Sequence, residues 1–143
     1  MEYLTIDELN LCWENQLKKA HRMCMPRTLI VCEFPQDTST LQAIISDTPG
    51  CFAKHGYGST IAVLFSNELE YACVIAEMAA HYSRNGIETA LSAVTYNGTQ
   101  NVPSDDFETA ARLSLESAFK NMQTARKTKQ PVHCDLSELL QTQ

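Results

Sequence analysis

The sequence lacks several features that would assign it at once to a class of protein. No apolar run approaches the roughly 20 residues that a membrane-spanning helix requires, and the acidic start, MEYLTIDELN, shows no signal-peptide pattern. Only 11 Lys and Arg residues stand against 17 Asp and Glu residues, so the formal net charge is −6. An acidic chain is unsuited to non-specific binding of nucleic acid or of an anionic membrane surface. We therefore expect a cytoplasmic protein with neither partner.

Paired metal-ligand motifs are also missing, although the chain has six cysteines. Their spacing is scattered, and no C-x-x-C occurs. Several lie in apolar stretches such as "LIVCEF" and "YACVIAEM", where a thiol acts as a small hydrophobic group. His21 and Cys24 lie one helical turn apart without a second pair, while His133 and Cys134 point to opposite faces of an expected strand. We predict reduced structural cysteines, no metal site and no cofactor.

With 143 residues, of which 44% are apolar, the chain suits one soluble domain over residues 1–143. Hydrophobic periodicity and turn signals predict the order α-β-α-β-β-α-β-α-β. The expected elements are a helix ending before Pro26, a strand at 28–34, a short helix near 41–45, a hairpin at 51–65, a helix at 68–84, a strand at 87–96, a helix at 104–127, a strand at 131–134 and a C-terminal tail that adds a helical turn or frays. The predicted fold class is α/β (α+β), with a ferredoxin-like βαββαβ core and a mixed sheet flanked by helices.

The stretch "KHGYGSTIAVLF" holds two of the five glycines, Gly56 and Gly58, directly before an apolar strand. A glycine turn of this kind allows backbone amides to approach a phosphate. From Ala53 to about Val132 the sequence resembles the GGDEF domains, the diguanylate cyclase family. "IAVLF" is similar to the strand after the family's motif, "NELEYACVIAEMAAHY" to the following helix, "ALSAVTYNGT" to the next strand, and "SLESAFKNMQTARKTKQPV" to the closing helix and last strand.

The resemblance places five residues at the five motif positions; these are Tyr57, Gly58, Ser59, Thr60 and Ile61. The family's motif acids therefore align with Ser59 and Thr60, which cannot hold a divalent metal. On the first strand only Glu33 stands in place of an aspartate-rich segment, and a lone carboxylate is a weak Mg²⁺ site. Residues 32–58 also leave room for one short helix, where the family has a longer excursion over the guanine. The resemblance thus implies a domain without cyclase activity.

The family's nucleotide-binding positions are changed as well. Those of the inhibitory product site align with Thr48 and Cys51, which cannot replace its bidentate arginine. The phosphate-binding lysine of the last helix aligns with Met122, and Lys120 is one alignment step away. Arg126 belongs to the basic segment "RKTKQ", which is either a phosphate-facing cluster or the solvated end of a helix.

Our leading hypothesis is a non-catalytic GGDEF-like interaction or regulatory scaffold that docks to a protein partner or to a second copy of itself. The resemblance suggests a bacterial pathway linked to cyclic di-GMP, such as biofilm formation or polysaccharide secretion. Candidate interface residues are Trp13, Met23 and Met25, although a tryptophan such as Trp13 is more often a core anchor.

Two other hypotheses stay open. The first is a receptor for a nucleotide or cyclic di-GMP, in which the 56–58 turn binds phosphate with help from Lys120 or Arg126. The second is a different enzyme that uses Ser59, His55 and Asp47 as nucleophile, base and orienting acid, although no spacing in the sequence fixes their geometry.

Overall fold

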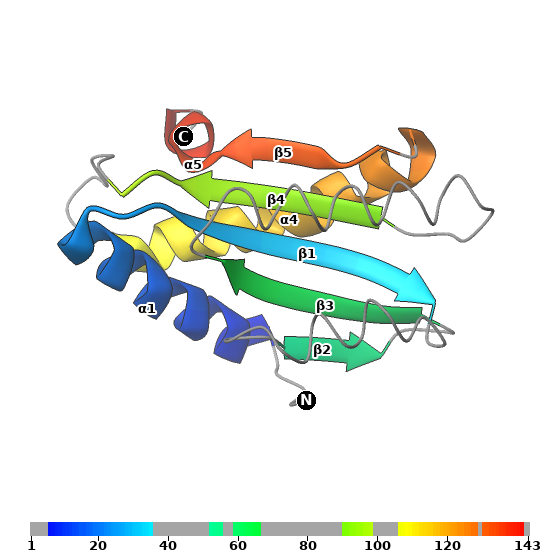
Figure 1. The fold of residues 1–143 in the computed structure, drawn as a ribbon, viewed down its shortest axis with the longest axis horizontal. Coiled ribbons are helices and arrows are strands. Elements are labelled where there is room, and N and C mark those ends of the chain that lie inside the picture. The colour runs from blue at the N-terminus through cyan, green and yellow to red at the C-terminus, as the bar shows by residue number, and fades with distance from the viewer. Residues whose placement is uncertain are drawn as a thin grey trace.

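The computed structural model describes residues 6–35, 52–55, 59–66, 90–98, 106–128 and 130–141 (Figure 1). In chain order, the elements are α1 (Ile6–Met23), β1 (Arg27–Pro35), β2 (Phe52–His55), β3 (Ser59–Ser66), β4 (Ala90–Tyr96), α4 (Phe107–Thr128), β5 (Val132–Asp135) and α5 (Leu136–Gln141). No helix in these ranges is both long and apolar enough to cross a membrane.

The five strands form one mixed sheet in the order β2-β3-β1-β4-β5. β1 lies between β3 and β4 and is antiparallel to both, while β5 adds to β4 in parallel. The first four strands thus have the ferredoxin-like arrangement, with a central first strand and an antiparallel β2–β3 hairpin. The predicted fold class is confirmed.

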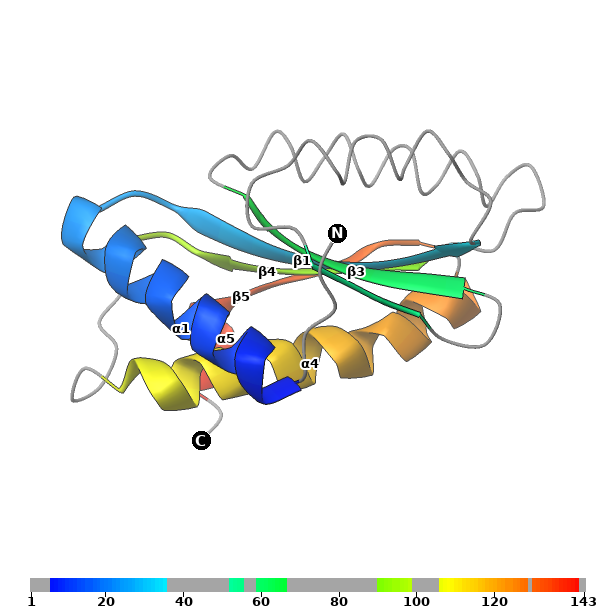
Figure 2. The ribbon, with the colours of Figure 1, turned by 90° about the horizontal axis from the view of Figure 1, so that it is seen from below.

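The core lies between one face of this sheet and the two long helices. Figure 2 shows α1 and α4 on the same side of the sheet. Alternate residues of β1 and β4 point to this side, because side chains of a strand alternate between its faces. These strand residues and the apolar side chains of the helices form the buried cluster. Its largest members are Trp13, Leu17, Leu29, Tyr96, Met122 and Leu136. Trp13, which is fully buried, is therefore a core residue and cannot form part of an exposed interaction face.

The predicted positions of the elements agree with the structure where the apolar periodicity of the sequence is strong. Strand β1 and the hairpin strands occur where expected, and the C-terminal tail forms α5. The last long helix begins at Phe107, because Asp106 caps it: the Thr109 amide donates to Asp106 Oδ1 at 3.0 Å. The Thr109 hydrogen bonds also lower the pKa of the Asp106 carboxyl. The predicted helices near 41–45 and at 68–84 lie outside the described residues.

Helix α1 ends in a Schellman turn, three residues before the proline that we expected to stop it. The Met25 amide donates to the Ala20 carbonyl at 3.1 Å, and the Cys24 amide donates to the His21 carbonyl at 3.3 Å. This turn needs a left-handed residue, and Cys24 supplies it at φ 50° where glycine is usual. Because a side chain is strained in this region, the helix end stores unfavourable energy.

Replacing Cys24 by glycine is expected to stabilise the protein. Glycine removes the left-handed penalty but adds chain entropy to the unfolded state, so the net gain is about 0.5–1 kcal/mol. The midpoint of urea unfolding should rise with an unchanged m-value.

A matched substitution at Gly98 should act in the opposite direction. Gly98 also has a positive φ, 86°, and an added Cβ would lie 2.6 Å from the Met25 carbonyl oxygen. Gly98→Ala should therefore lower the free energy of unfolding by more than about 1 kcal/mol.

If Cys24→Gly destabilises the protein, the assigned end of α1 is wrong.

Candidate functional site

An ion pair joins the end of the central strand to the end of the last long helix. Arg126 Nε donates to Glu33 Oε1 at 2.7 Å, and Arg126 Nη2 donates to Glu33 Oε2 at 2.8 Å. Glu33 has the same strand parity as the core residues Leu29 and Val31, so it faces the side covered by α4. A bidentate pair of this geometry fixes both side chains and engages both carboxylate oxygens.

This pair lies at the edge where the resemblance placed the altered motif. Glu33 is in register with Ile61, and Pro35 is in register with Ser59. Ser59 and Thr60 are thus the first two residues of β3 and not the tip of the hairpin turn. Residues 56–58, with the predicted phosphate-binding glycines and the first motif positions, lie outside the described residues.

Of the other predicted binding residues, Arg126 lies at this edge through its pair with Glu33. Lys120 is exposed on α4, while Met122, which the resemblance aligned with the family's lysine, is buried in the core. Arg126 is engaged by Glu33, and Lys129 of the same basic segment lies outside the described residues. Met23 and Met25 are 55% and 46% exposed, as an interaction face requires.

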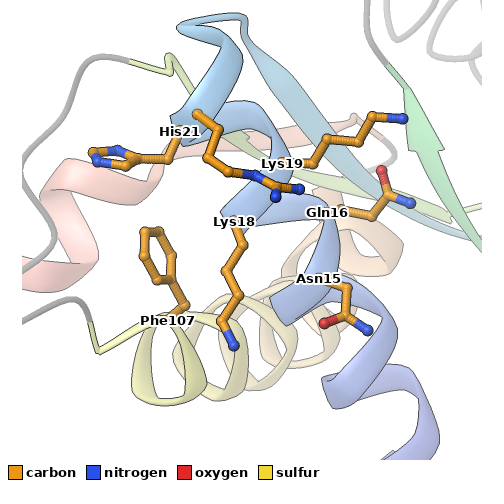
Figure 3. Close-up of a pocket in the computed structure, with 7 residues that line it drawn as sticks. Asn15, Gln16, Lys18, Lys19, His21 and Phe107 are labelled. Atoms are coloured by element: carbon orange, nitrogen blue, oxygen red, sulfur yellow. The ribbon is translucent and has the colours of Figure 1, made fainter.

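A second site, which the sequence did not indicate, lies at the other end of α4. An open pocket of about 700 Å³ is lined by six residues of α1 together with Phe107 from the start of α4 (Figure 3). The α1 residues are Asn15, Gln16, Lys18, Lys19, His21 and Arg22. The basic segment "KKAHR" is visible in the sequence, but only the packing of α1 against α4 shows that its side chains line a pocket.

His21 is the best-fixed side chain of this pocket. Its Nδ1 lies 2.7 Å from the Tyr96 hydroxyl, and its ring meets that of Phe107 edge-on with centroids 5.4 Å apart. Tyr96 is fully buried, and burial, followed by the nearby Cys24, raises the pKa of its phenol. The protonated hydroxyl therefore remains a hydrogen-bonding partner for the imidazole at neutral pH.

The cysteines in the described ranges form no disulfide. Desolvation by burial raises the pKa of both the Cys12 and the Cys134 thiols, so they resist ionisation. His133 is exposed while Cys134 packs against the core, which confirms their predicted opposite faces. Within the described part of the chain, no three His, Cys, Asp or Glu side chains come together as a metal site.

The Glu33–Arg126 pair is expected to couple the two residues energetically. Arg126 is 47% exposed and Glu33 20%, so water weakens the attraction, and the coupling should be about 1 kcal/mol, the upper end for exposed pairs. A double-mutant cycle with Glu33→Gln and Arg126→Gln, followed by urea unfolding, measures it. The coupling should shrink when salt is added, and a coupling of zero would show that the pair does not persist in solution.

Comparison with known proteins bears on the fold. No protein-family model matches the chain, and no curated protein is similar to it in sequence. A solved structure of a microbial GGDEF domain, described for a novel mode of interaction with cyclic di-GMP, is similar with a TM-score of 0.56 and 11% identity. The match covers 87% of this chain and 86% of that one. Because the identity is low, the likeness speaks for the architecture alone, and the chain has a GGDEF-like fold.

Proposed function

We propose that this chain is a non-catalytic GGDEF-like regulatory module that acts by docking to a protein partner or to a second copy of itself, in a bacterial pathway linked to cyclic di-GMP. The observation that carries the proposal is the Glu33–Arg126 pair. Cyclic dinucleotide synthesis needs carboxylates to hold divalent metals against the triphosphates. Glu33 is the one carboxylate of β1, and both of its oxygens are engaged by Arg126.

The hairpin supports the same conclusion. Ser59 and Thr60 begin β3 beside the end of β1, and neither residue type supplies the negative charge that a Mg²⁺ ion requires. With Glu33 neutralised and neutral residues at the start of β3, the described strands of this edge supply little of the electrostatic stabilisation that usually contributes most to catalysis.

A docking role is supported by the surface at the end of α1. Met23 and Met25 expose large thioether side chains on either side of Cys24, in a turn whose backbone is fixed by hydrogen bonds. Methionine adapts its shape to a partner, and exposed apolar side chains that lie together are typical of interaction sites.

A receptor for cyclic di-GMP is the second candidate. It is favoured by one observation, that the structurally similar GGDEF domain is described as interacting with this nucleotide. Titration calorimetry with cyclic di-GMP and with GTP separates the two candidates. Heat that saturates at micromolar concentration would support the receptor, and its absence would support the docking module.

The protein is expected to form no cyclic di-GMP from GTP and Mg²⁺. Arg126→Gln, which releases Glu33, should be equally inactive, because a single carboxylate binds Mg²⁺ weakly. Product formation is measured by chromatography beside an active diguanylate cyclase as positive control. Turnover that Glu33→Gln abolishes would contradict the proposal.

Changing both exposed methionines should remove partner binding without unfolding the domain. Met23→Ser with Met25→Ser deletes the apolar contacts, and because both side chains are exposed the unfolding midpoint should change little. Affinity capture from the native host with mass spectrometry, and sedimentation for self-association, provide the readouts.

Leu11→Ser is the matched control, because Leu11 is 57% exposed but lies three turns away along α1. A partner or dimer lost in the methionine variant and kept in the Leu11 variant is the expected result. Equal retention in both variants would place the interface elsewhere.

A further inference from the structure

We propose that the pocket between the end of α1 and the start of α4 binds a small phosphate-bearing anion. This site lies at the other end of α4 from the edge at Glu33 and Arg126, and its lining residue Arg22 directly precedes Met23. The inference does not depend on the proposed docking function. Phe107 and Arg126 are 19 residues apart on α4, which corresponds to about 28 Å at the helical rise.

The charge of the pocket is opposite to that of the chain. The chain carries a formal charge of −6, yet the lining residues include three cations and no carboxylate. Lys18 is partly neutralised, since its Nζ lies 2.8 Å from Glu14 Oε2. Within the described ranges, Lys19 and Arg22 form no ion pair, so about two positive charges stay uncompensated at the pocket.

The remaining lining groups favour a ligand with many acceptor oxygens. Asn15 and Gln16 provide amide donors on the same helix, next to the cations. Arg and Lys donate strong charge-assisted hydrogen bonds to phosphate oxygens. A phosphate group can accept from several of these donors at once, because its oxygens point in different directions.

The rigid side of the pocket argues for a built site. Phe107 is buried and supports the His21 ring, which the Tyr96 hydroxyl holds from the core. Figure 3 shows the His21 and Phe107 rings on one side of the pocket, while Lys18 and Lys19 extend from α1 in different directions, Lys19 away from the rings. The volume of about 700 Å³ lies within the range of small-molecule sites, which run from roughly 300 to 1,000 Å³.

The test uses inorganic pyrophosphate, titrated at constant ionic strength and followed by calorimetry and by amide chemical shifts. We expect saturable binding below about 10 mM, with the shift changes centred on residues 15–22 and on Phe107. Lys19→Gln with Arg22→Gln should weaken binding by about tenfold or more, because two charge-assisted contacts are lost.

The matched control is Lys120→Gln with Lys127→Gln. It changes the net charge by the same amount, and both lysines are exposed on α4 away from the pocket. Binding by the control variant should stay within about twofold of the wild type, since distant exposed charges are screened. Equal weakening in both variants would overturn the proposal, because it would show attraction to the general charge of the protein.

Citrate distinguishes phosphate from carboxylate recognition. It should bind at least about tenfold more weakly than pyrophosphate at equal ionic strength, because pyrophosphate carries its acceptor oxygens on two adjacent phosphate groups, whereas citrate spreads them over three carboxylates. Equal affinity for citrate would show that the class of ligand is wrong. Absence of saturable pyrophosphate binding, or shift changes confined to residues 56–58, would show that the pocket is not the site.

Discussion

The packing of α1 and α4 against one face of the sheet is the constraint on which both candidate sites depend. Trp13 and Leu17 of α1 are fully buried against residues of β1, β4 and α4, and this burial fixes how α1 is rotated about its axis. Once the apolar stripe faces inward, Lys18, Lys19 and Arg22 must face outward. The same packing fixes α4, whose buried Met122 and Ala125 leave Arg126 directed at Glu33. Burial of the apolar faces of α1 and α4 therefore determines where the charged side chains of both candidate sites lie.

Periodicity and turn residues predicted most of the described architecture, because each element carries its own local signal. The short apolar run "TLIVCEF" and the helical spacing of Leu9, Trp13 and Leu17 are properties of residues close together in the sequence. The candidate sites have no such signal. Glu33 and Arg126 are 93 residues apart in sequence, and nothing local to either residue indicates the other. Trp13 shows the same limit: its residue type favours the core but also suits an interface, and only its packing partners decide between the two.

A fold stabilised in this way tolerates sequence changes at the edge formed by the end of β1 and the start of β3. The described core consists of apolar side chains on the helix-covered face of the sheet, contributed by α1, β1, β4, α4 and α5. Residues at the start of β3 pair with the end of β1 through backbone hydrogen bonds, which any non-proline side chain permits. Ser59 and Thr60 can thus replace acids without loss of the ladder. Resemblance of fold and loss of chemistry are therefore compatible within one chain.

The two ends of α4 carry separate electrostatic environments. At the end of the helix Arg126 is neutralised by Glu33, while at its start the pocket retains uncompensated cations. Their separation of about 28 Å is more than three times the Debye length of about 8 Å at physiological ionic strength. Charge at one end therefore has almost no direct effect on the other. If an anion in the pocket influences the hairpin edge, the influence must travel mechanically, through displacement of α4 against the sheet. Because α4 packs on α1, β1 and β4 with fully buried side chains, such a displacement would have to move the whole core face.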